Sequence, residues 1–430
     1  MKNNKGITLV ALVVTIVVLL ILAGVSINLV LGNNGIIAKA KDAETKSAEA
    51  SENDLKGMNG LVSEMEGALA GNGSTGSGSG NGGAGGSGTD TKVPEAATAE
   101  TAPYFPDNTF TKKEGTIDTG LVIQDANGNE YVWVVVPRTT AVYKTTGLGK
   151  TTFTDADYTS IETDLKNYTS TYVITSGYSD VYYPDDKNVG WFADETAYNN
   201  LKNSMLKSVY ENGGFYVGRY EAGIDTTTGT NRTSNTDKNL DGKYTMPSTT
   251  PVTKADAYPY TYVTRTQAQN LASNVNSGDK TSSLMFGVQC DLVLAFMHNK
   301  GNIADSTLTS NSTTIGNYND NLWTIKNANA QYSTNYGSTF TACPNPFKKE
   351  SDSDILLTTG ADSSFSVQNI YDIAGNVREW TLEKNSNTNY PCASRGGSFN
   401  DAGSSGPAAN RKFSSTDSSF NFFGFRVSLF

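Results

Sequence analysis

The C-terminal sequence RGGSFNDAGSSGPAANRKFSSTDSSFNFFGFRVSLF, residues 395–430, begins and ends with two short motifs, Arg395–Ser398 (RGGS) and Gly424–Val427 (GFRV). A segment this polar lacks the apolar area that offsets the entropy of ordering a chain, so its composition alone predicts disorder. It nevertheless contains phenylalanines with no strand or helix period, set among Ser, Asn, Asp and Gly. Aromatic anchors among small, adaptable polar residues are typical of a binding surface.

Two further motifs precede this segment: GFYVGRYE at residues 214–221 and YDIAGNVREWT at residues 371–381. Together with a predicted helix beginning TQA at Thr266, and with the two C-terminal motifs, they resemble the formylglycine-generating-enzyme and sulfatase-modifying family. The resemblance covers most of residues 104–430. It implies a C-type-lectin-type fold for that part of the chain.

Local patterns in residues 104–430 predict an α+β domain, with strands early, helices in the middle and strands at the end. Apolar runs on both sides of an Asn-Gly turn predict a β-hairpin, and long Thr-, Ser- and Asn-rich stretches predict surface loops. The predicted segments are a hairpin at 119–123 and 131–137, a strand at 213–221, helices at 267–274 and 291–298, and loops at 226–250 and 306–338.

The Gly375–Trp380 turn has two possible roles. In relatives this turn can contribute oxygen ligands to a structural Ca²⁺, and the resemblance assigns that role to Asn376 and Glu379. Carboxylate, amide and backbone oxygens suit such a hard cation. In the alternative, Glu379 pairs with a basic residue such as Arg395 or Arg426, while Trp380 fills the core. Apart from this possible Ca²⁺, no cofactor is expected.

The number and positions of the cysteines and histidines argue against catalysis. The formylglycine-generating members use a cysteine pair after the RGGS motif, and here no cysteine follows Cys392. The other two cysteines, Cys290 and Cys343, are distant from it in sequence. The sequence is compatible with three buried thiols and with one disulfide plus one free thiol. His298 is the single histidine, so a histidine-rich metal centre is excluded. The sequence predicts that the protein is not an enzyme.

The net charge of −10 argues against a nucleic-acid partner, because phosphate binding requires clustered Lys and Arg. Abundant uncharged polar residues favour an exposed, secreted type of domain.

The N-terminus, MKNNKG followed by the uncharged residues 7–31, resembles a type IV prepilin. An apolar run of this length spans a bilayer, which needs about 20 residues as a helix. The resemblance implies that a prepilin peptidase cuts after Gly6 and that the new N-terminus, Ile7, is methylated. The family usually places Glu five residues after the cut, where this chain has Ala11, which puts filament assembly in doubt. An ordinary signal anchor is the alternative.

This organisation predicts a single-pass membrane protein with its C-terminal domain outside the cell, in contact with a membrane and with other pilin subunits. A Gly/Ser-rich stretch too flexible to form a core separates the anchor from the domain. The predicted parts are a leader at 1–6, a transmembrane or pilin-core helix at 7–31, a helical stalk at 32–70, a flexible linker at 71–103, and a C-type-lectin-fold domain at 104–430.

The C-type-lectin-type fold also includes the variable proteins of diversity-generating retroelements, and residues 395–430 resemble their variable region. In that class, adenine-directed mutagenesis rewrites Asn-type codons, so Lys, Glu, Gln, Met and Trp should be rare in the segment. From Ser398 to Phe423, Lys412 is the one such residue.

The resulting hypothesis is a cell-surface receptor or adhesin that binds an extracellular protein or carbohydrate. Gly406–Arg411 is predicted to be a scaffold turn. The predicted contact residues are Phe399, Asn400, Asp401, Ser404, Ser405, Phe413, Ser414, Ser415, Thr416, Asp417, Phe420, Asn421, Phe422 and Phe423. The alternatives are a structural minor pilin without diversified binding and a divergent enzyme of the formylglycine-generating type.

Overall fold

A computed structural model describes residues 97–275 and 280–430. The predicted leader, anchor, stalk and most of the linker, including Gly6 and Ile7, lie outside the described residues. Within 97–275 and 280–430, no helix combines the length and the apolarity needed to cross a membrane.

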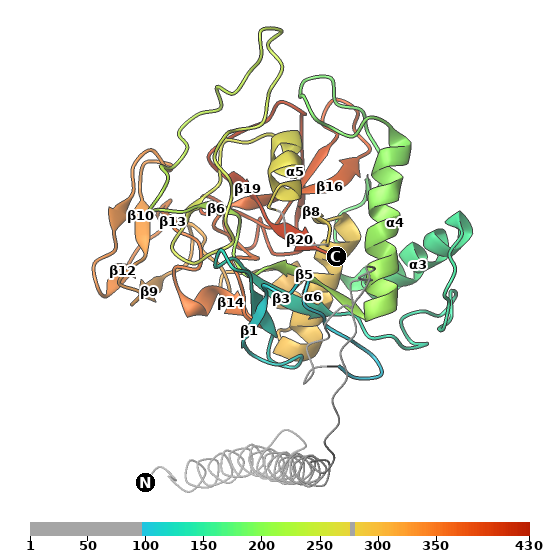
Figure 1. Ribbon diagram of the computed structural model, residues 1–430. Helices are drawn as coiled ribbons and strands as arrows, with labels where there is room; N and C mark the ends of the chain where they lie inside the picture. Colours follow the sequence, from blue (N-terminus) through green and yellow to red (C-terminus); the bar gives the residue numbers. More distant parts are fainter. Residues whose placement is uncertain (1–96, 276–279) are drawn as a thin grey trace, which may run out of the picture. The chain divides into compact units, whose positions relative to one another are not determined.

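The central six-stranded sheet joins both ends of the domain (Figure 1). Its strands, in spatial order, are β1 (Thr111–Glu114), β2 (Val122–Gln124), β3 (Glu130–Val135), β5 (Gly214–Gly218), β20 (Val427–Leu429) and β8 (Ser282–Leu284). The predicted hairpin is confirmed as the antiparallel β2–β3 pair. Its turn is closed by Asp125, whose carboxylate accepts the backbone N–H groups of Asn127 and Asn129, and by Gly128 at a φ of 84°.

A second sheet of five strands carries the C-terminal motifs. Its strands are β18 (Arg411–Ser414), β17 (Cys392–Arg395), β16 (Arg378–Asn385) and β19 (Phe423–Phe425), with β4 (Tyr178–Ser179) also paired to β16. The β16–β19 pair is parallel, which brings the motif of residues 371–381 beside the end of the chain.

Five helices and two 3₁₀ turns accompany the sheets in the described residues. They are α3 (Asp155–Tyr168), α4 (Glu195–Asn212), α5 (Arg265–Ser273), α6 (Gly287–Gly301), α7 (Asp305–Thr309), η1 (Ser170–Tyr172) and η2 (Ser363–Phe365). The predictions of helices at 267–274 and 291–298 are confirmed by α5 and α6. Helix α6 is buried from Gly287 to Met297, as its apolar sequence requires. Helix α4 ends at Gly213, whose left-handed φ of 68° glycine adopts without strain.

Residues 306–338 differ from the predicted loop, because they contain short strands that belong to small sheets. These sheets are β10 (Gln331–Ser333) with β11 (Thr341–Ala342) and β13 (Leu356–Leu357), and β9 (Trp323–Ile325) with β12 (Phe347–Lys349). Two further small sheets lie outside this range: β14 (Ser366–Val367) with β15 (Ile370–Tyr371), and β6 (Gly223–Ile224) with β7 (Tyr258–Pro259). A separate apolar cluster that includes Trp323, Ile325 and Phe365 supports this part.

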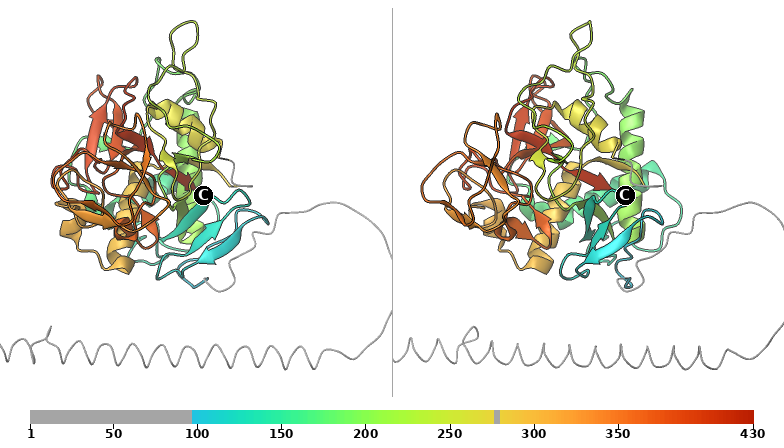
Figure 2. Two further views of the ribbon diagram at one scale, coloured as in Figure 1. Left: turned by 90° about the vertical axis from the view of Figure 1, so that its left-hand side faces the viewer. Right: turned by 60° about the vertical axis from the view of Figure 1, so that its left-hand side comes forward.

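The two small sheets formed by strands β9 to β13 lie on the opposite side of the domain from the α3–α4 helix pair (Figures 1 and 2). The predicted loop at 226–250 is present, and the segment between β6 and β7 projects from the body in each view. The prediction of a mixed α/β domain is confirmed.

A matched pair of leucines tests whether the chain end is integral to the core. Leu429 of β20 is fully buried, whereas Leu240 is fully exposed. We expect Leu429→Ala to lower the free energy of unfolding by about 2–5 kcal/mol, because it removes buried methyl groups and leaves a cavity. Leu240→Ala should change it by less than about 0.5 kcal/mol. Chemical denaturation of both variants measures the difference, and equal effects would contradict the placement of β20.

Candidate functional site: the C-terminal surface

The arginines at the ends of the first C-terminal loop are buried in a charge network. Arg395 ends β17 and Arg411 begins β18, and both reach Asp291 of α6 and Glu383 of β16. Arg395 lies 2.7 Å from Glu383 and 2.9 Å from Asp291, and Arg411 lies 3.0 Å and 2.6 Å from the same two carboxylates. We call these four residues the buried tetrad. Although burial alone would raise it, the two guanidinium groups hold the pKa of Glu383 below its usual value.

The loop between these arginines is structural at its centre. Pro407, Ala408 and Ala409 are buried, as the predicted scaffold turn requires. The backbone N–H of Ala409 bonds to Leu308 O, and the Tyr318 hydroxyl donates to Gly406 O at 2.7 Å. A side chain at Gly406 would collide with the backbone of Gly397, so the two loop strands approach closely.

Three of the predicted contact residues are held by the protein itself. Phe399 is fully buried against Leu356 and Val377, and Phe423 is buried against Trp380 at a ring separation of 4.2 Å. The prediction of a surface contact is therefore wrong for both phenylalanines. Asp401 is mostly buried. It accepts hydrogen bonds from Arg378 at 2.7–3.1 Å and from Ser398 at 2.7 Å, so its carboxylate fixes the loop.

Other predicted aromatics do reach the surface. Phe413 and Phe420 are 52% and 50% exposed. Phe413 lies 5.6 Å from the exposed ring of Tyr390, and Phe420 stacks on the partly exposed ring of Phe422 at 5.4 Å. We call these four residues the aromatic face. An exposed apolar group of this size is typical of an interaction site.

Charged side chains link the Phe420–Phe422 pair to strand β18, on which Lys412 and Phe413 are successive residues whose side chains point to opposite faces of the sheet. The Arg378 guanidinium lies over the Phe422 ring at 4.8 Å and also binds Asp401, which in turn accepts a hydrogen bond from Lys412 on β18. The contacts thus run without a break from Phe422 to the strand that carries Phe413. Asn400, Ser414 and Asn421 are partly exposed and border this surface, while Ser404 and Ser405 are exposed on the loop before Gly406.

A hollow of about 510 Å³ adjoins the aromatic face. Ser415, Thr416 and Asp417 form one wall, and two segments distant in sequence, around Tyr183 and Asn389, form the others. Asn188 donates to Thr416 O at 2.8 Å, and the Tyr183 hydroxyl donates to Thr388 O at 3.0 Å. Four residues of this surface were not predicted from the sequence. Tyr183, Asn389 and Tyr390 lie in loops without a motif. Arg378 was noted only as part of the family motif at 371–381, and not as a surface residue.

The two residues predicted to bind Ca²⁺ have protein partners. Glu379 Oε1 accepts from Arg426, with a closest N–O distance of 2.6 Å, as the alternative proposed. Asn376 Oδ1 accepts the N–H of Leu357 and the amide of Asn317, and its Nδ2 donates to Glu221 at 2.7 Å. No cluster of three or more His, Cys, Asp or Glu with metal-binding potential occurs in residues 97–275 and 280–430. The geometry favours the ion pair.

Arg426 is the one base that offsets a group of buried acids. Glu221, Asp372 and Glu379 surround it, and all three are at most 3% exposed. Burial, together with repulsion among the carboxylates, raises the pKa of Glu221 well above its usual range and that of Asp372 to about 6. One guanidinium does not neutralise three carboxylates, so the folded protein favours protonation of this group.

The three thiols are buried, and His298, near the end of α6, lies 3.2 Å from Asp305. Cys290, Cys343 and Cys392 are unpaired and buried, and burial raises the pKa of both Cys343 and Cys392 to about 11. Such thiols stay protonated near neutral pH, whereas the thiolate is the nucleophile. His298 Nδ1 lies 2.9 Å from Ile303 O, at the end of α6.

A family model matches the C-terminal part of the domain. Residues 303–429 match the Sulfatase-modifying factor enzyme 1-like domain, which confirms the resemblance for the C-terminal part of the chain. The described part is thus a mixed α/β domain whose residues 303–429 are similar to the formylglycine-generating-enzyme type of C-type-lectin-like fold. No curated protein matches the chain.

Three solved structures show weak similarity. PvdO from Pseudomonas aeruginosa is 14% identical, with 74% of this chain and 99% of that chain covered and a TM-score of 0.32. CarF is 14% identical, with 58% and 95% covered and a TM-score of 0.25. Variable protein 1 of Treponema denticola is 12% identical, with 75% and 99% covered and a TM-score of 0.21.

The buried acids around Arg426 predict that the stability of the fold depends on pH. Because the folded-state pKa of Asp372 lies above its unfolded value of 3.8, this carboxyl stabilises the fold below about pH 4, and the contribution is lost as the pH rises through 6. Asp372→Asn keeps an acceptor for the N–H of Gly360 and suits the left-handed φ of 56°. The variant should gain on the order of 1–3 kcal/mol relative to wild type between pH 4 and pH 8.

Denaturant unfolding at several pH values measures this difference. Asp241→Asn, at an exposed position, is the control and should follow the wild type. A difference between Asp372→Asn and wild type that does not change with pH would contradict the raised pKa.

Proposed function

We propose that residues 104–430 form a non-enzymatic ligand-binding domain whose binding surface is the aromatic face together with the adjoining exposed loops. The observation that carries the proposal is the half exposure of Phe413 and Phe420 on the segment between Arg411 and Arg426, both of which are fixed by buried ion pairs. Exposed rings on a rigid support bind a partner with little loss of conformational entropy.

The thiol chemistry supports a binding role over catalysis. The family's enzymes depend on a cysteine pair after the RGGS motif, and residues 396–430 contain no cysteine. The three thiols present are buried, and in the described residues they form no disulfide. A protein or carbohydrate ligand, bound by shape and aromatic contact, is consistent with the polar hollow beside Phe413.

Diversification of the C-terminal segment belongs to the same proposal. The residues expected to change without damage to the core are Asn400, Ser404, Ser405, Phe413–Asp417, Phe420 and Asn421, all exposed or partly exposed. Phe422 is also partly exposed, but it packs against the core. The interior is held by Phe399, Phe423 and the scaffold turn, which variation would have to spare. This division between surface and frame is what a repeatedly rewritten binding loop requires.

Display at the cell surface completes the proposal. Residues 7–31 would tether the chain in a membrane or pilus after cleavage at Gly6 by a prepilin peptidase and methylation of Ile7. The Gly-rich residues 71–88 would then let the domain reorient toward a ligand outside the cell. Nucleic acid is not proposed as a partner, since the chain carries a net charge of −10.

The test uses the full chain against panels of extracellular proteins and glycans. Phe413→Ser combined with Phe420→Ser should weaken binding of any captured ligand by roughly 100-fold or more, because two aromatic anchors at the centre of a contact each contribute about 2 kcal/mol. The free energy of unfolding should change by less than about 0.5 kcal/mol per site. By contrast, Phe399→Ser should cost about 3–5 kcal/mol through loss of core packing.

The matched control is Leu240→Ala, which also removes an exposed apolar side chain but at a distance in sequence from the aromatic face. A ligand that binds the double variant and the wild type equally would overturn the proposed surface. A catalytic turnover that persists when all three cysteines are replaced by Ser would overturn the non-enzymatic assignment.

A further inference from the structure

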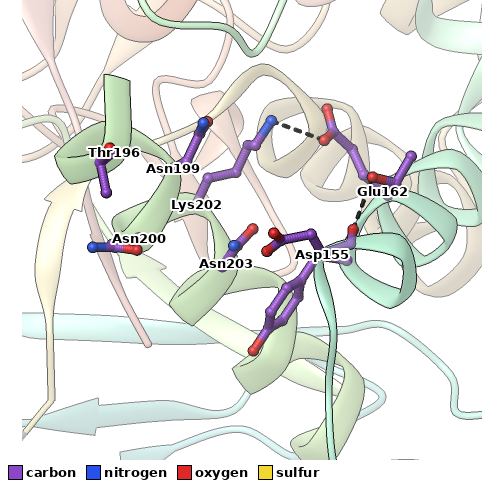
Figure 3. Close-up of a pocket in the computed structure, with 9 residues that line it drawn as sticks. Asp155, Glu162, Thr196, Asn199, Asn200, Lys202 and Asn203 are labelled. Carbon is purple, nitrogen blue, oxygen red and sulfur yellow. Dashed lines mark hydrogen bonds and ion pairs between the residues drawn. The ribbon is translucent and has the colours of Figure 1, made fainter. Parts of the chain in front are cut away.

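A polar groove of about 470 Å³ lies between α3 and α4, lined by residues of those two helices alone (Figure 3). On α3 the lining residues recur at helical spacing, from Asp155 through Tyr158 to Glu162. On α4 a matching row runs through Thr196, Asn199 and Asn203. These polar residues are exposed or partly exposed, whereas apolar residues of the same helices, such as Leu165 and Leu206, are buried, so the rows form the solvent-facing walls of the groove.

One end of the groove is fixed by a shared ion pair. Lys202 of α4 reaches Glu162 of α3 at 3.0 Å and also donates to Asp180 O at 2.9 Å. Glu162 pairs in addition with Lys166 at 2.5 Å. The two helices are thereby held at a set separation, and neither Lys202 nor Glu162 is left with an uncompensated charge.

The Thr159 hydroxyl, which also lines the groove, donates to Asp155 O at 2.9 Å within α3. Among the described residues, the side-chain amides of Asn199, Asn200 and Asn203 make no hydrogen bond, and neither does the Asp155 carboxylate. In Figure 3 the side chains of Asn203 and Asp155 project from opposite helices. Each amide offers both a donor and an acceptor, so the groove presents alternating hydrogen-bonding groups.

An aromatic ring adds an apolar patch to this polar lining. Tyr158 is partly exposed, and its ring stacks on Phe153 at 5.6 Å with an interplanar angle of 16°. Phe153 in turn packs edge-on against Tyr210, so the Tyr158 ring is supported from behind. A ligand in the groove would meet amides and a carboxylate around a supported aromatic ring.

We infer that the α3–α4 groove is a second binding site, which takes a neutral saccharide. Sugar hydroxyls donate and accept at once, as do the Asn199 and Asn203 amides, and the C–H face of a pyranose suits the Tyr158 ring. The charges of the groove lining agree with an uncharged ligand. Glu162 is neutralised by two lysines, and Asp155 is the single carboxylate of the lining that has no basic partner. An anionic ligand would find no unpaired base in the groove lining.

The site is independent of the aromatic face proposed above, since its lining residues come from 155–162 and 196–203 and none from 395–430. Its volume lies within the range of about 300–1,000 Å³ usual for small-molecule sites.

The test probes the full chain on an array of neutral mono- to tetrasaccharides, followed by titration of each saccharide that binds. Asn199→Ala combined with Asn203→Ala should weaken binding about tenfold or more, because each lost hydrogen bond contributes about 1 kcal/mol. Ser204→Ala is the matched control on the same helix; it does not line the groove and should bind as wild type. Thermal unfolding of both variants should match the wild type.

Three results would overturn the inference. One is an array with no saccharide bound, and the second is binding unchanged by the Asn199/Asn203 substitutions. The third is binding of spermidine instead of saccharide, abolished by Asp155→Asn, which would make the groove a cation site. Saccharide binding lost in the Phe413→Ser/Phe420→Ser variant, but kept in the asparagine variant, would assign the glycan to the aromatic face instead.

Discussion

Two arginines and two carboxylates, paired inside the domain, determine where the C-terminal loops begin and end. Arg395 and Arg411 bind the same Asp291 and Glu383, so β17, β18, β16 and α6 meet at one buried point. Loss of one partner would leave a buried charge uncompensated, at a cost of about 3–5 kcal/mol. The buried tetrad therefore resists any rearrangement of the loop between the two arginines.

This constraint explains how a segment of such polar composition is ordered. The entropy of ordering small polar residues is offset by groups that point inward, namely Phe399, Phe423 and the Arg426–Glu379 pair. The residues between them need only follow the path these anchors define. Phe413 and Phe420 can then remain exposed without a stabilising role, which is the property expected of a contact surface and of positions that tolerate change.

Much of the fold was predictable because its elements carry periodic or turn signals. The hairpin around Asp125–Gly128, the strand at 214–218 and helices α5 and α6 follow from such patterns. The interior position of Phe399 and Phe423 was not predictable, since an irregular loop has no repeat that fixes the direction of its side chains. The short strands within 306–338 were not predicted for a related reason. They pair with distant partners such as Leu356–Leu357, and Thr, Ser and Asn dominate the segment around them.

The candidate site was likewise predictable only in part. The sequence located the exposed segment and offered Arg426 as a partner for Glu379, yet it gave no indication that Tyr183, Asn389 and Tyr390 would lie beside Ser415–Asp417. These contacts depend on β4 and β18 flanking β16 and β17 in one sheet, a long-range pairing that local patterns do not encode.

The most direct measurement is deep sequencing of the 3′ end of the gene in one population. The account predicts clustered substitutions at the exposed positions, among them Asn400, Ser404, Phe413, Thr416 and Phe420, with Phe399, Phe423 and the buried tetrad unchanged. A uniform segment, or substitutions spread equally over buried and exposed positions, would contradict the claim that residues 395–430 form a variable surface on a fixed frame.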